Sequence, residues 1–380
     1  MAPTETPDIV RDDSHRRATT GRWCLGTRLL VAGTAAWTLF LVLHIAFTGR
    51  WWPWSVFAAT PAPALIAVPL LLLVVTPLAR PVRRRLSVVL VALLLAGAHL
   101  AGYGPGWTNG AAGDTRGTEV KVFAWSTDYW QMSDDKDAFY AFLRRQDADV
   151  YLLQEYLYWN EGPHRREDQP IRVDDSARLR AEFPGYRLSV EGELLTLSRL
   201  PVVADHHSRV PGTGTDWYWK GAKTQRTDLR VGGRTVSFYN VHLPVPFYIG
   251  NPLSGRSYRF LKDHGVWWTG ELRRLRADLA GNPHPAVVAG DFNTPWMKLS
   301  SLGAGAVTHS PAGSVLPPRS WPVSDYPLPR LWRLDWLFTT GDLAVPGYRF
   351  GGGAAFSDHA AQEIRVVVPP PAGSAPQAPS

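Results

Sequence analysis

Three long segments without charged residues constrain this chain most. Asp, Glu, Lys and Arg are absent from residues 29–49, 51–79 and 86–113, and each segment exceeds the roughly 20 apolar residues that span a bilayer. None of them has a polar face, which disfavours buried helices of a soluble core. A cleavable signal peptide is disfavoured because two more apolar segments follow the first. We predict transmembrane helices at about 26–48, 54–77 and 86–104, the second made irregular by three prolines.

The distribution of Arg predicts the orientation of these helices. Five Arg precede the first segment, only Arg50 lies in the next turn, and four Arg lie between the second and third segments. Because short cytoplasmic loops are enriched in Lys and Arg, we predict a cytoplasmic tail at 1–22 and a transmembrane region at 23–104. Everything after Tyr103 would then be extracellular, in a multi-pass protein of the cell membrane.

Net charge gives little support for a nucleic-acid partner. The chain carries a formal charge of +7, but from residue 104 onward 30 basic residues face 29 acidic ones, so the surface field that attracts phosphate backbones is not expected there. The single Cys24 excludes an intrachain disulfide and a thiolate metal cluster. Arg greatly outnumbers Lys, which hints at a GC-rich bacterial genome.

A soluble pattern follows a Gly-rich linker at 105–117. Short apolar runs predict strands at about 120–125, 150–153, 186–190, 194–198, 202–208, 226–231, 234–241, 334–340 and 362–368. One helix should begin near Asp134, and a longer one has an apolar stripe from Leu261 to Leu279 and ends before Pro283. These elements predict an α/β sandwich of largely antiparallel sheets over 118–368, followed by a low-complexity, disordered tail at 369–380.

A central strand over residues 287–293 carries the clearest site signal. The apolar run beginning at Val287 reads as a buried strand, and it ends in Asp291, Phe292 and Asn293. Because side chains alternate along a strand, Asp291 and Asn293 face one side and Phe292 the other. An isolated sequence of this kind is also compatible with an Asx turn that caps the strand.

Other predicted strands also end in polar residues. The full set is Asp128, Glu155, His242, Asp291, Asn293, Asp335, Asp358 and His359. Each alone is compatible with a solvated loop, but together they supply hard oxygen ligands and two imidazoles. That combination suits Mg²⁺-assisted attack of water on a phosphorus centre.

The motifs that contain these residues resemble those of the endonuclease/exonuclease/phosphatase superfamily, in the family's order and over about residues 118–368. They are Trp125-Ser126-Thr127-Asp128, Leu153-Gln154-Glu155, Asn240-Val241-His242-Leu243, Gly290-Asp291-Phe292-Asn293, Arg333-Leu334-Asp335-Trp336 and Ser357-Asp358-His359. The resemblance implies a four-layered α/β sandwich. It also implies a metal-dependent hydrolase of phosphoester or pyrophosphate bonds.

The resemblance further implies a metal site. Glu155 would be the principal ligand of Mg²⁺, or of Mn²⁺, and Asp128 and Asp358 would complete its shell directly or through water. The family usually has Asn where Ser126 stands. Ser keeps a hydroxyl but lacks the amide donor, so the placement of the metal or the substrate pocket can differ, and activity can be weakened.

The remaining motif residues receive catalytic roles from the same resemblance. Asp291 would orient or deprotonate the attacking water, and Asn293 would hydrogen-bond a phosphate oxygen. His359 would contact the scissile phosphate, with its ring held by Asp335. His242 would be a second phosphate contact or the proton donor to the leaving group.

The substrate is suggested by architecture. Three spans followed by an exported domain resemble the VanJ-type bacterial membrane phosphatases, which implies a lipid-linked phosphate or pyrophosphate such as undecaprenyl pyrophosphate as partner, beside the bilayer itself. Clusters of two or three aromatic residues at 217–219, 247–248 and 267–268 fit an interfacial enzyme, although Trp268 lies on the helical stripe and is expected in the core. Lys220, Lys223 and Arg226 could bind a second phosphate or form a solvated strand face.

Two alternatives stay open from the sequence. One is an extracellular membrane-bound nuclease or phospholipid phosphodiesterase. A nuclease would need a basic groove, and the nearly neutral charge of the domain does not indicate one. The other is a non-catalytic protein that binds a lipid phosphate, and Ser126 is the only residue that supports this alternative. No protein partner is inferred.

Overall fold

The computed structural model describes residues 23–103, 116–130, 135–160, 169–207, 215–246, 254–312, 316, 318–324, 327, 329–353 and 355–371. The tail at 1–22, most of the linker at 105–117 and the end of the chain lie outside these ranges, so the expectations for them are not addressed by the structure. The same holds for Phe247 and Tyr248.

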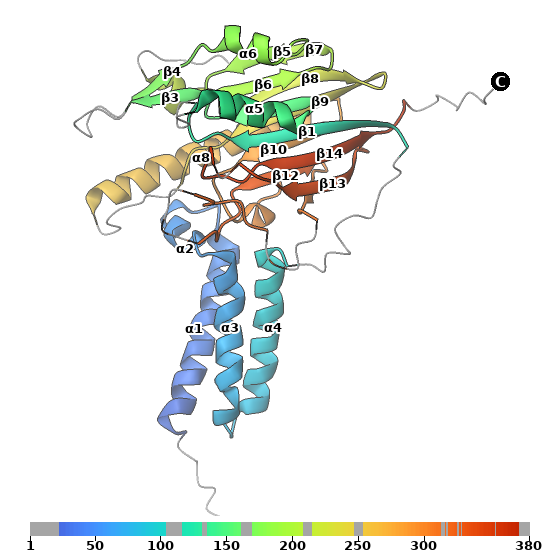
Figure 1. Cartoon of the computed structure of the whole chain (residues 1–380). Helices are drawn as coiled ribbons and strands as arrows, with labels where there is room; N and C mark the ends of the chain where they lie inside the picture. The colour runs from blue at the N-terminus through green and yellow to red at the C-terminus, as the bar shows by residue number, and fades with distance from the viewer. Residues whose placement is uncertain are drawn as a thin grey trace, which may run out of the picture.

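The N-terminal region consists of apolar helices that lie side by side beneath a folded domain (Figure 1). Helices α1 (Leu25–Phe47) and α4 (Arg83–Ala101) are each long and apolar enough to cross a membrane. The segment between them is broken into η1 (Trp52–Trp54), α2 (Ser55–Ala58), α3 (Ala62–Val75) and η2 (Thr76–Leu78), with a bend of 66°. Pro61 and Pro63 lie at this break, where proline cannot continue a helix. The described region therefore holds two possible spans, or three if the bent pair counts as one.

Two six-stranded sheets form the folded domain, in the strand orders β13-β14-β1-β2-β6-β5 and β11-β12-β10-β9-β8-β7. The first sheet contains β1 (Thr118–Ser126), β2 (Val150–Gln154), β5 (Arg187–Glu191), β6 (Leu194–Ser198), β13 (Ala344–Phe350) and β14 (Gln362–Val368). The second contains β7 (Val202–His206), β8 (Thr224–Val231), β9 (Arg234–His242), β10 (Ala286–Asp291), β11 (Val307–His309) and β12 (Asp335–Thr339). Most neighbours are antiparallel, but β1 with β2 and β10 with β9 are parallel.

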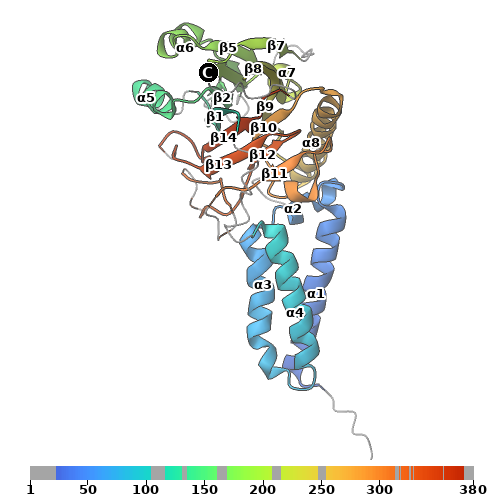
Figure 2. The same ribbon diagram turned by 90° about the vertical axis from the view of Figure 1, so that its right-hand side faces the viewer.

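Helices cover the outer faces of both sheets. Helices α5 (Lys136–Gln146) and α6 (Ser176–Glu182) lie over the first sheet, and α8 (Gly255–Gly281) lies over the second (Figure 2). Apolar side chains fill each of the three interfaces: Leu152 and Phe238 between the sheets, Tyr140 under the first pair of helices, and Leu272 under α8. The predicted four-layered sandwich is confirmed.

Several short elements were not predicted from the sequence. These are β3 (Leu157–Asn160), β4 (Gln169–Arg172), α6, α7 (Asp216–Trp219), β11 and β13. Most are edge or hairpin elements whose residues do not alternate cleanly between apolar and polar, so their pairing depends on neighbours far away in the sequence.

The domain packs directly on the end of the apolar helices. Trp54 belongs to the same core cluster as Trp268 and Trp296, and the Trp332 indole donates a hydrogen bond to the Ala59 carbonyl at 2.8 Å. A Cβ on Gly265 of α8 would lie only 2.9 Å from the Cβ of Trp52. The helices and the domain are therefore one packed unit, and the long helix α8 lies across the end of the apolar bundle.

Candidate active site

The predicted site residues meet at one end of the sandwich, where β1, β2, β9 and β10 end and the antiparallel strand β12 begins. Asp335 is the first residue of β12, and Asp358 and His359 precede β14, so the expectation that these three residues follow strand ends was wrong. Ser126 at the end of β1 pairs with Gln154 of β2, while Asp291 of β10 pairs with His242 of β9 and with Asp335 of β12. Three non-glycine residues just past these ends, Asp128, Glu155 and Asn293, have positive φ angles of 49°, 63° and 53°. Left-handed backbone at such residues is costly and concentrates at functional sites.

Asp291 lies at the centre of the cluster. Its side chain is buried; one oxygen accepts the Asn293 backbone N–H at 2.7 Å, and the other lies 3.7 Å from Nε2 of both His242 and His359. Burial raises the pKa of Asp291 to about 6, the charges of the two imidazoles oppose that rise, and the charge of Asp335 adds to it. A carboxyl with such a pKa can accept a proton near neutral pH.

His359 forms a hydrogen-bonded pair with Asp335. Its Nδ1 lies 2.8 Å from Asp335 Oδ2, and its backbone N–H donates to the Ser357 hydroxyl. The Ser320 hydroxyl accepts the backbone N–H of Asp335 at 3.1 Å, which fixes the start of β12. Burial alone would lower the pKa of His359, but the charges of Asp335, Asp291 and Asp358 raise it well above the usual value. These carboxylates therefore favour the cationic form of the imidazole.

His242 has a buried partner that the sequence reasoning missed. Its Nδ1 lies 3.1 Å from an oxygen of Glu193, whose other oxygen accepts a hydrogen bond from the ammonium of Lys223. Burial alone would lower the pKa of His242, but the charges of Glu193 and Glu155 raise it. Glu193 was missed because it lies in a turn before a predicted strand, whereas the site residues were sought at strand ends. The only sequence signal for it is a charged residue directly before an apolar run. The Lys223 side chain is only 3% exposed. The expectation that Lys223 belongs to a solvated strand face was therefore wrong.

Glu155 is a largely buried carboxylate among other acids. Its side chain is 16% exposed; one oxygen accepts the Tyr129 backbone N–H at 3.1 Å, and the other lies 3.8 Å from His242 Nε2. Burial raises the pKa of Glu155 to about 8, and the charges of Asp128 and Asp358 add to the rise against the opposing charge of His242. A divalent cation bound by this carboxylate would offset the cost of its burial. The donor set thus fits a hard metal ion.

Asp358 extends this acidic region toward His359. One of its oxygens accepts the Trp321 indole N–H at 2.6 Å, and the other lies 3.8 Å from His359 Nε2. The ligand atoms of Asp291, Asp335 and His359 also lie within 4.8 Å of one another. Because Asp335 already holds the His359 ring, we regard that group as catalytic and the carboxylate of Glu155 as the better metal ligand.

Two further predicted residues have defined local roles. The Asn293 amide donates a hydrogen bond to the Leu243 carbonyl at 2.9 Å, so its second amide hydrogen is the one left for a ligand. The Ser126 hydroxyl is buried and has no hydrogen-bond partner in the described part of the chain. Ser126 therefore gives no side-chain hydrogen bond to Glu155.

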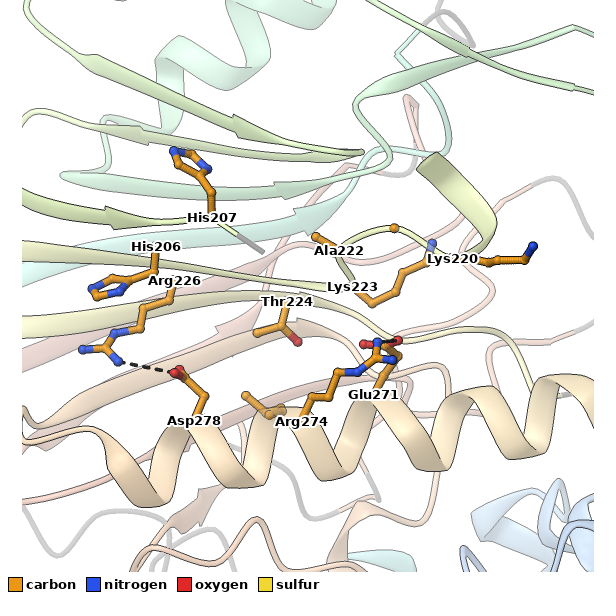
Figure 3. A pocket seen from close by; sticks show the side chains of 12 residues that line it. His206, His207, Lys220, Ala222, Lys223, Thr224, Arg226, Glu271, Arg274 and Asp278 are labelled. Carbon is orange, nitrogen blue, oxygen red and sulfur yellow. Dashed lines mark hydrogen bonds and ion pairs between the residues drawn. The ribbon is translucent and has the colours of Figure 1, made fainter. Parts of the chain in front are cut away.

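A pocket of about 500 Å³ lies between β8 and α8 (Figure 3), and none of the predicted catalytic or metal-binding residues lines it. Its cations are paired: Arg226 lies 3.5 Å from Asp278, Arg274 contacts Glu271, and Lys220 lies 3.0 Å from Asp216. These pairings weaken the alternative that Lys220, Lys223 and Arg226 bind a second phosphate.

The sequence pattern of the Endonuclease/Exonuclease/phosphatase family matches residues 106–359. The chain belongs to the endonuclease/exonuclease/phosphatase family. Members of this family are phosphoester hydrolases of nuclease or phosphatase type and generally depend on a divalent metal. No curated protein matches the sequence.

Several solved structures align with about two thirds of this chain at low sequence identity. A truncated TDP2 from Caenorhabditis elegans is 18% identical, with a TM-score of 0.44 over 66% of this chain and 98% of that one. Beta toxin from Staphylococcus aureus is 14% identical, with a TM-score of 0.45 over 64% of this chain and 99% of that one. An endonuclease/exonuclease/phosphatase from Beutenbergia cavernae is 18% identical, with a TM-score of 0.44 over 66% and 72%.

Proposed function

We propose that this chain is a membrane-anchored, divalent-metal-dependent phosphoesterase that hydrolyses a lipid-linked phosphate or pyrophosphate, such as undecaprenyl pyrophosphate. The observation that carries the proposal is the central cluster: two buried imidazoles, each beside a carboxylate, converge at 3.7 Å on Asp291. This cluster stands on a domain that packs against apolar helices able to span a membrane.

The residues of the cluster divide the work of hydrolysis. Asp291, with a pKa raised to about 6, takes a proton from the attacking water as its oxygen bonds to phosphorus. Cationic His359, held by Asp335, binds a non-bridging phosphate oxygen, and Asn293 offers its free amide hydrogen to another. As the bond from phosphorus to the leaving oxygen breaks, His242 gives that oxygen a proton.

Glu155 would hold the metal, with Asp128 and Asp358 nearby, and Mg²⁺ and Mn²⁺ both suit such oxygen ligands. A bound divalent cation would neutralise charge that develops on the phosphoryl oxygens. The raised pKa of Glu155 supports this assignment because the buried carboxylate gains most from a cation.

The proposed topology follows from the Arg bias and has its own test. The only cysteine, Cys24, lies at the N-terminal end of α1, on the side proposed to be cytoplasmic. A membrane-impermeant maleimide added to intact cells should leave Cys24 unlabelled and should label a C24S variant that carries Asp342→Cys in the domain. If Cys24 is labelled and the Asp342→Cys variant is not, the orientation is the opposite of the one proposed.

A substrate panel tests the proposed reaction. The detergent-purified full chain is given undecaprenyl pyrophosphate, a phospholipid, and single- and double-stranded DNA, each with Mg²⁺, with Mn²⁺ and with EDTA. We expect metal-dependent phosphate release from the lipid pyrophosphate and much slower cleavage of the rest. Faster cleavage of DNA or of the phospholipid would support the catalytic site but refute the proposed lipid-linked substrate. Binding without cleavage would favour a non-catalytic protein.

A further inference from the structure

Partly buried aromatic rings form a continuous surface between the active site and helix α8. We call it the aromatic strip, and its members are Tyr129, Trp159, Tyr218, Trp219, Phe260, His264 and Trp267. They come from the loop after β1, from β3, from α7 and from the N-terminal half of α8. Rings that recur at one surface from four separate segments are not explained by the periodicity of any single element.

Ring contacts connect the strip from one end to the other. Tyr129 stacks on Trp159 with centroids 5.4 Å apart, and Trp159 contacts Trp219 at 6.0 Å. Trp219 contacts His264 at 6.3 Å, and His264 stacks on Phe260 at 3.7 Å. The rings therefore form one contiguous aromatic cluster.

One end of the strip lies at the catalytic cluster. The backbone N–H of Tyr129 donates to Glu155, the proposed metal ligand, at 3.1 Å. The ammonium of Lys223 lies 4.1 Å from the ring centroid of Tyr218, and the same ammonium is bonded to Glu193, the partner of His242. A phosphate at the cluster would leave its substituent against these rings.

The other end lies on the helix that rests on the membrane helices. Phe260 and His264 belong to α8, and on another face of α8 Tyr258 meets Trp52 edge to face with centroids 4.9 Å apart. Trp52 follows the end of α1, an apolar helix long enough to span a membrane. This end of the strip therefore lies on the helix that contacts Trp52, and Figure 1 shows α8 just above the apolar helices.

The chemistry of the strip favours an apolar chain over a nucleic acid. Aromatic grooves for single-stranded nucleic acids also need cations that follow the phosphates, whereas Lys220 is paired with Asp216 and Lys223 with Glu193. Partly exposed rings instead offer apolar area at little entropic cost. An apolar chain that leaves the bilayer loses about 0.8 kcal/mol per methylene, a loss that contact with the rings can offset.

We propose that the aromatic strip binds the hydrocarbon chain of the substrate while its phosphate occupies the catalytic cluster. The inference rests on the proposed function and adds to it that the ligand has a single long chain, of isoprenoid or acyl type, which the domain itself recognises. Anchoring alone would concentrate any lipid, whereas the strip selects by chain length.

Two substrates with the same head group test this. Geranylgeranyl pyrophosphate and dimethylallyl pyrophosphate differ in chain length, and both are offered to the detergent-purified full chain at one detergent concentration. Trp159→Ala and Trp219→Ala should each raise KM for the long substrate about tenfold, or about 1.4 kcal/mol, if the chain covers about 55 Å² of each ring at about 25 cal/mol/Å². Neither change should alter KM for the short substrate.

Phe350→Ala is the matched control, because this half-buried aromatic lies on β13 outside the strip. An equal rise in KM for both substrates, or a rise in the control variant, would mean a structural effect. Either result would overturn the inference but not the proposed phosphoesterase function. If the wild type cleaves DNA rather than lipid and the strip variants weaken that, both proposals fail and the strip stacks bases. If the wild type cleaves nothing, calorimetric binding of geranylgeranyl phosphate decides, and equal affinity in Trp159→Ala overturns the inference.

Discussion

Replacing Glu193 by Gln tests the buried network beneath His242. The Glu193 side chain is 1% exposed, Lys223 3% and His242 5%, so the variant leaves a lysine ammonium buried without its carboxylate. Breaking a buried pair on one side costs about 3 to 5 kcal/mol. At about 2 to 4 °C per kcal/mol for a domain of this size, a loss of about 4 kcal/mol lowers the melting temperature by about 8 to 16 °C.

The assay is thermal unfolding of the detergent-purified chain, followed by near-ultraviolet circular dichroism. Asp342→Asn is the control, because it breaks the exposed ion pair between Asp342 and Arg234, and exposed pairs contribute about 0 to 1 kcal/mol. The double variant Glu193→Gln/Lys223→Met should recover part of the loss, since no charge is then stranded. A Glu193→Gln variant as stable as the control, or a double variant less stable than the single one, would refute this reasoning.

The other predictions concern single groups. In the pH profile of kcat/KM, activity should rise as pH increases through about 6, where Asp291 ionises; a flat profile from pH 5 to 7 would exclude Asp291 as the base. Asp335→Asn should lower the pKa of His359 and reduce kcat at least about a hundredfold, and unchanged kcat would remove Asp335 from the site. Mg²⁺ should raise the melting temperature more at pH 8 than at pH 5, since the Glu155 proton, with a pKa near 8, must leave first; Glu155→Gln should abolish the effect, and its persistence would place the metal elsewhere. Gly290→Ala should unfold the domain, because a Cβ there would lie 2.1 Å from the Val241 carbonyl oxygen at φ +142°, and a native melting curve would contradict this.

The sequence predicted what local pattern determines. The strand that ends in Asp291 is apolar over its whole length and carries its polar residues at the last positions, so both its burial and its polar end can be read directly. The stripe on α8 similarly predicted that Trp268 lies in the core, and its side chain is 2% exposed.

Contacts between distant segments could not be predicted in this way. Glu193 and Lys223 are 30 positions apart and meet only because β6 and β8 belong to different sheets that pack face to face. The hydrogen bond between Trp321 and Asp358 likewise joins one loop to another, 37 positions later, between β13 and β14. Residue type alone assigns such side chains to solvent, so buried charges of this kind become visible only in the fold.

The docking of the domain on the apolar helices was also beyond sequence patterns. Trp54 begins the second predicted span, yet its side chain is buried in the same core cluster as Trp268 of the folded domain. An aromatic residue near a predicted span fits either environment, and only the packing distinguishes them.

The central claim is that hydrolysis occurs at the Asp291 cluster with a bound metal, and one comparison tests it directly. Phosphate release from undecaprenyl pyrophosphate is measured with Mg²⁺ and with EDTA for the wild type, Asp291→Asn and the remote control Asp342→Asn. We expect release that needs Mg²⁺, that the control retains, and that Asp291→Asn reduces by orders of magnitude because the group acts in the transition state. Release that persists in EDTA, or in an Asp291→Asn variant that is properly folded, would contradict the account.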